Sequence, residues 1–217
     1  MMLYERYPVL TACQEAIEKA TSHLIRTFEE GGKLLVCGNG GSCADSDHIV
    51  GELMKGFLHK REVGEDFAAK LRQAGFADAE KVSSKLQGAL PAISLTSQSA
   101  LLSAFANDVD AEMVYAQMVY GYGQKGDSLL CLSTSGNSRN VTAAAKVAKA
   151  KGLTTIAMTG EAESGLSRLC DISIRVPETE TFKVQELHLP VYHYLCMQVE
   201  RHFFGDADAG ESHRLNP

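Results

Sequence analysis

The chain has 217 residues, of which 45% are hydrophobic and 22% charged, and its formal net charge is −6. At about 100–200 residues per domain this length predicts a single domain, and the composition excludes a disordered, collagen-like or coiled-coil protein. Because the overall charge is negative, we expect no nucleic acid and no anionic membrane surface among the partners. Any phosphate that the chain binds must therefore be held by groups at its binding site and not by the overall charge of the protein.

No apolar run reaches the roughly 18 residues that a membrane span needs, and residues 1–8 lack the basic and apolar regions of a signal peptide. We therefore expect a cytoplasmic protein. The six cysteines are widely spaced, form no CxxC pair and mostly lie in apolar segments, so we expect buried reduced thiols.

The first predicted element is a helix over about residues 7–30, where apolar side chains recur at helical spacing until Gly31-Gly32 stops them. Residues 33–37 are a short apolar run followed at once by the loop Gly38-Asn39-Gly40-Gly41-Ser42. This pattern is typical of a buried strand that opens onto a tight loop. The next helix is predicted from about Cys43 to Phe57.

Between about residues 58 and 89 the sequence becomes charged and helix-favouring, without a good strand pattern. Two interpretations fit this segment. It is either a solvated helical insertion, which we favour, or a lid over a site.

The unit of strand, polar loop and helix then recurs. Residues 128–132 are apolar and lead into Ser133-Thr134-Ser135-Gly136-Asn137-Ser138, followed by a helix over 141–151. Because strands alternate with helices of about 10–15 residues, we predict an α/β fold: a three-layer α/β/α sandwich with a parallel sheet flanked by helices. The remaining predicted elements are strands at 90–96, 153–158 and 172–176, a final helix at about 182–204, and a frayed tail at about 205–217.

Both polar loops are suited to holding a phosphate. In an open parallel sheet ligands lie outside the carboxyl ends of the strands, where small residues let backbone N–H groups approach an anion at a helix N-terminus. The alternative is that these residues serve only as turn and helix-cap residues. Two such loops at equivalent places favour the anion site. Neither loop carries a dinucleotide or P-loop fingerprint, which argues against a nucleotide cofactor.

Several histidines lie near acidic or amide side chains. His48 and Glu52 are four residues apart in a predicted helix, so they project from one face and reach one ion or one substrate. Gln185, His188 and His193 share the final helix, where a histidine is otherwise more often an ordinary core residue. Each of these features alone is weak.

Gln185 and His193 pose a geometric problem if both bind one ion. They are eight residues apart, about 12 Å along an unbroken helix. Three alternatives remain open: the helix begins after Gln185, it is distorted at Pro190, or one ligand comes from a neighbouring subunit.

Five motifs occur in order along the chain: Cys37-Gly38-Asn39-Gly40-Gly41-Ser42, Asp45-Ser46-Asp47-His48 with Glu52-Leu53, Ala106-Asn107-Asp108, Ser133-Thr134-Ser135-Gly136-Asn137-Ser138, and Val184-Gln185-Glu186-Leu187-His188 with His193. Together they resemble the phosphoheptose isomerase (sedoheptulose 7-phosphate isomerase) family of the sugar isomerase (SIS) fold. The resemblance spans about residues 8–204 apart from the insertion.

The resemblance implies a single SIS domain, a homotetramer with sites shared between subunits, and an aldose–ketose isomerase. The implied reaction converts sedoheptulose 7-phosphate to D-glycero-D-manno-heptose 7-phosphate through an enediolate, with one zinc ion per active site. Glu52 and His193 fall on the family's acid/base pair. The implied zinc ligands are His48, Glu52, Gln185 and His193. The implied substrate-binding residues are Asn39, Gly40, Gly41, Ser42, Glu52, Asn107, Asp108, Ser133, Thr134, Ser135, Ser138 and Gln185.

The chain departs from the family pattern at three places. The family commonly places Gly-Arg after Glu-Leu, whereas Met54-Lys55-Gly56-Phe57 follows here, so Lys55 is a displaced cation. The insertion at 58–89 is longer than the family's usual connection, and Glu180-Thr181-Phe182-Lys183 stands where an Asp-Arg pair is expected. These changes surround the sugar and leave the proposed metal cluster intact, so they bear on specificity more than on reaction type.

Two other functions fit a SIS scaffold. One is a non-catalytic protein that binds a protein partner, like the initiator-associating protein of bacterial replication, which lacks the acid/base pair that Glu52 and His193 form here. The other is a sugar-phosphate-sensing regulator, for which the sequence offers no helix-turn-helix segment and no basic patch. We therefore favour catalysis.

Overall fold

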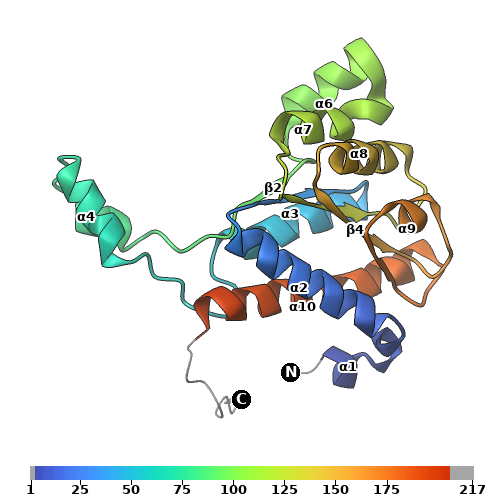
Figure 1. Cartoon of the computed structure of the whole chain (residues 1–217), viewed down its shortest axis with the longest axis horizontal. Helices are drawn as coiled ribbons and strands as arrows, with labels where there is room; N and C mark the ends of the chain where they lie inside the picture. The colour runs from blue at the N-terminus through green and yellow to red at the C-terminus, as the bar shows by residue number, and fades with distance from the viewer. Residues whose placement is uncertain (1–2, 206–217) are drawn as a thin grey trace.

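A five-stranded parallel sheet forms the centre of the computed structural model, which describes residues 3–205 (Figure 1). The strand order is β2-β1-β3-β4-β5, so the chain turns to one side of β1 for β2 and to the other side for β3. Neighbouring strands pair in parallel, and Cys37 at the end of β1 lies opposite Cys131 of β3. The strands are β1 (Leu34–Cys37), β2 (Ala92–Ser94), β3 (Ser128–Leu132), β4 (Thr154–Thr159) and β5 (Ile172–Arg175).

Helices cover both faces of this sheet. Alternate side chains of the strands enter two separate apolar clusters, as expected where both faces are buried. One face packs against α2 (Gln14–Glu29), α3 (Gly41–Met54) and α10 (Thr181–Phe204). The other packs against α7 (Val114–Tyr122), α8 (Arg139–Ala150) and α9 (Gly165–Leu169). This is the three-layer α/β/α sandwich that the sequence predicts.

The remaining helical segments are short, and several of them pack at the margins of these layers. Within residues 3–205, no helix is both long and apolar enough to span a membrane. The six cysteines are free thiols, and four of them are buried.

The remaining helical segments are α1 (Leu3–Arg6), the 3₁₀ helix η1 (Pro8–Cys13), α4 (Glu65–Gln73), α5 (Ala79–Ser83), α6 (Ser99–Phe105), the π-helical turn η2 (Ala106–Asp110) and the 3₁₀ turn η3 (Ala111–Met113).

The predicted strands and most predicted helices agree with these bounds to within a few residues, and the differences are local. The helix predicted from residue 7 begins as a 3₁₀ helix and becomes α-helical at Gln14. Residues 99–122 and 165–169 are helical although no element is predicted there. Leu102, Phe105, Val109 and Met113 have helical spacing, but α6, η2 and η3 leave them half-buried or exposed, so they form no strong buried face. Beyond Gly205, the predicted tail lies outside the described residues.

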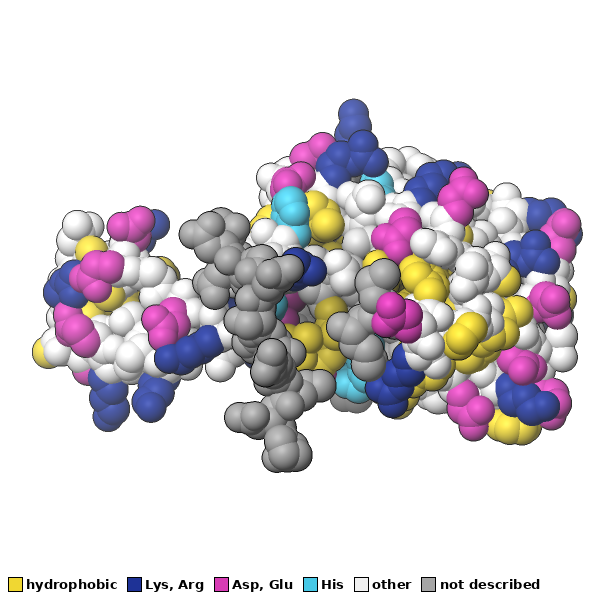
Figure 2. Space-filling model, turned by 90° about the horizontal axis from the view of Figure 1, so that it is seen from below, with side chains coloured by type: hydrophobic (Ala, Val, Ile, Leu, Met, Phe, Trp, Pro, Cys, Tyr) yellow, Lys and Arg dark blue, Asp and Glu magenta, His cyan; other side chains and the backbone are white. Residues whose placement is uncertain are grey.

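The segment between α3 and β2 forms an arm that projects from the body of the molecule (Figure 1). At its tip α4 packs against α5, and Arg72 bridges Glu65 and Glu80. Figure 2 shows that both signs of charge cover this arm. It extends away from its own domain, so the interpretation as a lid over a site of the same chain does not fit.

The base of the arm is buried, which corrects the prediction of a wholly solvated insertion. Arg61 is only 1% exposed, and its guanidinium donates to Glu200 Oε1 at 2.8 Å. It also donates to the carbonyl oxygens of Leu53 and Glu52, the last turn of α3. Arg61 therefore ties the arm to α10 and caps the carboxyl end of α3.

Glu200 gives this anchor a pH dependence. Burial alone would raise the pKa of its carboxyl, but hydrogen bonds from the N–H groups of Phe57 and Leu58 and the ion pair with Arg61 outweigh burial and lower it. A lowered folded-state pKa stabilises the fold above the unfolded-state pKa of about 4.3, and this contribution is lost as the pH falls through the folded-state value. In urea titrations at pH 6 to pH 3, we expect the wild type to lose more unfolding free energy than Glu200→Gln. Parallel losses in the two proteins would contradict this assignment.

Candidate active site

The two polar loops of the sequence meet at one cavity. The loop after β1 and the loop after β3 lie on either side of the point where the strand order reverses, the usual ligand position in an open α/β sheet. The cavity has a volume of about 380 Å³. Its lining residues are Asn39, Gly40, Gly41, Ser42, Leu132, Ser133, Thr134, Ser138, Thr181 and Gln185.

The first loop brings a helix N-terminus to this cavity. Gly40 has φ +56°, a conformation that side chains with a Cβ rarely adopt, and α3 begins at the next residue. A Cβ at Gly41 would lie 2.5 Å from Gln185 Nε2, so a larger residue there would displace the end of this side chain from the cavity. The macrodipole of α3, whose N-terminus lies at this cavity, favours an anion in this place.

Asn39 is fixed by residues that the sequence analysis does not single out. Its side-chain amide exchanges two hydrogen bonds with that of Asn140, at 2.9 and 3.0 Å. The Tyr115 hydroxyl donates to the Gly38 carbonyl at 2.7 Å. These contacts join segments 77 and 101 residues apart, so no local sequence pattern could have revealed them.

The second loop presents hydroxyl groups. Ser133 Oγ and Ser138 Oγ are 2.9 Å apart, and both residues line the cavity with Thr134. Between them Gly136 has φ +65°, and a Cβ there would lie 2.0 Å from Ser164 Oγ. Hydroxyls can donate to phosphate oxygens without adding charge. The cavity between the two loops, which we call the anion cavity, therefore offers groups of the kind that suit a phosphate, independently of the net charge of the surface.

Gly136→Ala tests the geometry of the second loop. A non-glycine residue in the left-handed region costs about 1–2 kcal/mol, and the contact with Ser164 adds to this cost. We expect Gly136→Ala to lower the free energy of unfolding by more than Gly126→Ala, and to raise KM for a phosphorylated substrate. Gly126 is the matched control because it has φ +93° and open space around its Cβ position. Equal urea midpoints for the two variants would contradict this account.

A second group of site residues lies farther along α3 and α10. His48 Nε2 is 3.1 Å from Glu52 Oε1, and the rings of His48 and His193 meet edge to face with centroids 5.0 Å apart. Lys55 Nζ lies 3.5 Å from Glu52 Oε2, although its own side chain is 61% exposed. Burial and the nearby His48 lower the pKa of His193, and Glu52 partly offsets them. Glu52 and His193 therefore both contact His48 within one chain, and their acid/base roles stay a prediction.

Two atoms of this group belong to chemical classes that commonly bind metal ions. Glu52 Oε2 and His193 Nε2 are buried and make no hydrogen bond, and imidazole nitrogen and carboxylate oxygen are ordinary zinc ligands. Within residues 3–205, however, no three His, Cys, Asp or Glu side chains converge tightly enough to hold an ion. The donors present suit zinc, but their geometry in one chain does not complete a site.

Gln185 does not join this group. Its side chain packs against Gly41 and lines the anion cavity, whereas His193 lies eight residues farther along α10. The helix begins at Thr181 and continues through Pro190 to Phe204, so the alternative that it begins after Gln185 is wrong. The third alternative, a ligand from a neighbouring subunit, stays a prediction.

Three other predicted substrate residues do not line the cavity. Asn107 and Asp108 are exposed on the π-helical turn η2 and bond to each other at 2.8 Å. Ser135 Oγ accepts from the backbone N–H of Asn137 within its own loop. Conversely, Thr181 lines the cavity, although the resemblance does not imply it as a substrate-binding residue.

His188 is part of the buried core and not of the candidate active site. It is fully buried on α10, and burial lowers its pKa to about 4. Neither ring nitrogen has a hydrogen-bond partner. It lies outside both groups of site residues, as expected for a core histidine.

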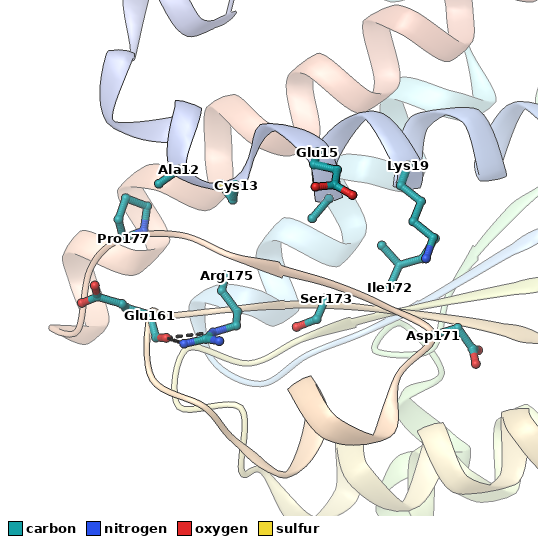
Figure 3. A pocket seen from close by; sticks show the side chains of 11 residues that line it. Ala12, Cys13, Glu15, Lys19, Glu161, Asp171, Ile172, Ser173, Arg175 and Pro177 are labelled. Atoms are coloured by element: carbon teal, nitrogen blue, oxygen red, sulfur yellow. Dashed lines mark hydrogen bonds between the residues drawn. The ribbon is translucent and has the colours of Figure 1, made fainter.

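Another hollow, of about 510 Å³, lies between α2 and the edge strand β5 (Figure 3). Charged side chains of both signs line it, including Glu15, Lys19 and Arg175, and the Arg175 guanidinium donates to the carbonyl of Glu161. It contains no residue of the five motifs and lies at the sheet edge, away from the strand-order reversal. The cavity between the two loops therefore remains the candidate active site.

Comparisons with known proteins agree with this architecture. The SIS domain family model matches residues 7–87 and 73–160. Phosphoheptose isomerase from Synechocystis sp. is 37% identical over 195 residues, covering 90% of this chain and 87% of that protein. The enzyme of the same name from Burkholderia pseudomallei is 36% identical over 189 residues, covering 87% and 83%. The solved structure of a phosphoheptose isomerase from Francisella tularensis has a TM-score of 0.74 and 28% identity, covering 90% of this chain and 91% of that one.

The fold, the paired loops and these relatives define a SIS-domain enzyme, an aldose–ketose isomerase that acts on a sugar phosphate. Within that class the chain belongs to the phosphoheptose isomerase family. The predictions of family, fold and enzyme class are confirmed, and the alternative of a non-catalytic binding protein loses its support.

Proposed function

We propose that the chain interconverts sedoheptulose 7-phosphate and D-glycero-D-manno-heptose 7-phosphate. The observation that carries this proposal is the separation of the anion cavity from the pair Glu52 and His193. Gly41 at the cavity and His48 beside the pair are seven residues apart on α3, about 10 Å along the helix. In an extended seven-carbon ketose phosphate, the carbonyl carbon and the phosphorus are seven bonds apart, roughly 8 Å. Among common ketose phosphates, a heptose phosphate therefore spans more of this separation than a pentose or hexose phosphate does.

Each residue has a role in this reaction. The loop hydroxyls and the N-terminus of α3 bind the phosphate. Moving a carbonyl from C2 to C1 requires a base for the proton on carbon and an acid for the oxygen, with an enediolate between the two sugars. Glu52 transfers the proton between C1 and C2, and His193 serves the oxygens. Lys55, 3.5 Å from Glu52, adds positive charge near the developing enediolate.

We further propose that His48, Glu52, His193 and Gln185 hold one zinc ion. Polarisation of the substrate carbonyl is the chemistry that zinc supplies when bound. Glu52 Oε2 and His193 Nε2, which make no hydrogen bond, support this assignment, and Lys55 is the ion-pair partner of Oε2 at 3.5 Å. The continuity of α10 supports a shared site in which a neighbouring subunit supplies one ligand, within a homotetramer. From the sequence, we also keep the proposal of a cytoplasmic location.

The substrate proposal is tested with ketose phosphates of five, six and seven carbons. A six-carbon substrate is one bond, about 1.2 Å, shorter, so it cannot reach both ends of the site equally well. We expect the highest kcat/KM for sedoheptulose 7-phosphate, no turnover of unphosphorylated sedoheptulose, and loss of activity after dialysis against a chelator. A six-carbon substrate turned over as well as the heptose would refute the substrate assignment. Full activity after complete zinc removal would refute the zinc assignment.

A further inference from the structure

A pair of side-chain amides joins the two loops of the anion cavity. Asn39, in the loop after β1, donates from Nδ2 to Asn140 Oδ1 at 2.9 Å, and Asn140 donates from its own Nδ2 to Asn39 Oδ1 at 3.0 Å. Asn140 lies in the first turn of α8, two residues after Ser138 of the second loop. Asn39 lines the cavity, whereas Asn140 does not. The pair therefore connects a residue of the candidate site to one outside it.

A third hydrogen bond determines how both amides are oriented. The backbone N–H of Val141 donates to Asn140 Oδ1 at 3.0 Å. Because a backbone N–H can only donate, the Asn140 atom beside it must be the oxygen. Asn140 then turns its NH₂ group toward Asn39, which must offer its own oxygen in return. The start of α8 therefore sets the orientation of the Asn39 amide.

Tyr115 does not replace Asn140 in this role. Its hydroxyl also reaches Asn39 Oδ1, but at 3.4 Å, and it lies only 2.7 Å from the Gly38 carbonyl oxygen. A tyrosine hydroxyl has one proton to donate, and the shorter contact takes it. Asn140 is therefore the main partner of the Asn39 amide.

One N–H of Asn39 remains available to a ligand. Its NH₂ group carries two hydrogens, and Asn140 Oδ1 accepts one of them. In the part of the chain that the structure describes, Asn39 Nδ2 makes no other hydrogen bond. Asn39 is exposed at the cavity, directly before Gly40 and the N-terminus of α3. A second N–H in this place suits an oxygen of a phosphate or of a sugar hydroxyl.

We propose that Asn140 is a positioning residue, which holds the Asn39 amide so that its second N–H donates to an oxygen of the bound sugar phosphate. An amide that is held in place before binding loses less rotational freedom on binding, so the pair increases affinity. The identity of the ligand rests on the proposed function, whereas the pairing of the two amides does not.

The first test measures KM and kcat of Asn140→Ala with sedoheptulose 7-phosphate. A hydrogen bond to a charged group changes affinity about 10- to 100-fold, and Asn140→Ala removes the alignment but not the donor, so we expect KM to rise about 10-fold. We expect kcat to change by less than about twofold, because Glu52 and His193 are not altered. The matched control is Thr142→Ala, two residues farther along α8, which does not line the cavity. This control should keep both constants of the wild type.

Inorganic phosphate, used as a competitive inhibitor, locates the oxygen that Asn39 contacts. An inhibition constant that rises with KM in Asn140→Ala assigns this oxygen to the phosphate, and an unchanged constant assigns it to the sugar. Both results support the positioning role, since KM for the whole substrate rises in each.

A double-variant cycle tests whether Asn140 acts through Asn39. If it does, Asn140→Ala should not raise KM further in a protein that already carries Asn39→Ala, whereas independent residues would multiply their effects. Urea unfolding of the same four proteins tests the pairing without any substrate. Asn140→Ala should shift the midpoint less in the Asn39→Ala protein than in the wild type. The unfolding curves also check that each variant is folded.

The outcomes separate this inference from the proposed function. A wild-type KM in Asn140→Ala, or the same rise in KM with and without Asn39, would overturn the positioning role. Additive shifts of the urea midpoints would show that the amides are not paired and would overturn it as well. A wild-type protein that turns over no sugar phosphate would refute the proposed function, and the urea cycle would still decide whether Asn140 holds Asn39.

Discussion

Glu52→Gln is expected to lower kcat by about 10³-fold while the variant still binds the sugar phosphate, because positioned proton transfer contributes about 10²- to 10⁴-fold in enzymes. The amide keeps the shape of the side chain but cannot accept a proton from carbon. The anion cavity contains no atom of Glu52, so the phosphate contacts are kept. Stopped assays for kcat and calorimetric titration with substrate measure the two properties separately.

The molecule offers a matched control for this variant. Glu29 forms a second His–Glu contact, with Oε1 2.7 Å from His202 Nε2, on the surface of α2 and the end of α10. Glu29→Gln should keep the activity of the wild type. An active Glu52→Gln variant would remove Glu52 from the mechanism, and one that loses substrate binding as well would mean that its carboxylate serves binding rather than proton transfer.

Arg61→Met is expected to lower the free energy of unfolding by about 3–5 kcal/mol, because it leaves the Glu200 carboxylate buried without its ion-pair partner. Glu200 is 0% exposed, so water cannot replace the guanidinium. The carbonyls of Leu53 and Glu52 lose a donor at the same time. Urea denaturation measures the loss.

Two further variants separate the buried pair from a general effect of charge. Arg72→Met removes the ion pairs on the exposed arm and should cost less than about 1 kcal/mol. The double variant Arg61→Met/Glu200→Leu removes both buried charges and should recover part of the stability lost by Arg61→Met. A loss below about 1 kcal/mol in Arg61→Met would contradict the role of this pair as the anchor of the arm.

The sheet could be predicted from the sequence because its strands are short, continuous apolar runs that end in glycine- or serine-rich loops. Such runs are typical of strands buried on both faces. The opposite case is the helical segment over residues 99–113. Its few apolar side chains have helical spacing, but most of its side chains are exposed, so the pattern is too weak to identify a helix. Arg61 shows a related limit. It lies in a charged stretch that indicates solvent, and only the tertiary partner Glu200 makes its burial favourable.

The candidate site likewise contains features that the sequence predicts and others that it does not. The loops at Gly38–Ser42 and Ser133–Ser138 could be predicted because each follows a strand, and parallel strands bring their carboxyl ends to one edge. The pairing of Asp45 with Tyr192 could not, because the two residues are 147 positions apart and neither has a distinctive neighbour pattern. The same holds for Asn39 and Asn140. In the proposed zinc site a neighbouring subunit supplies one ligand, and the sequence of one chain does not describe such a contact.

The central claim is that the enzyme isomerises a heptose phosphate by moving a proton through Glu52. The most direct measurement is NMR spectroscopy of sedoheptulose 7-phosphate incubated with the enzyme in D₂O. We predict an aldose 7-phosphate product and deuterium at the carbon that gains the proton, since a carboxylate base exchanges with solvent, and neither signal with Glu52→Gln. Recovery of the unlabelled ketose alone, under conditions in which the protein is folded and loaded with zinc, would contradict the account.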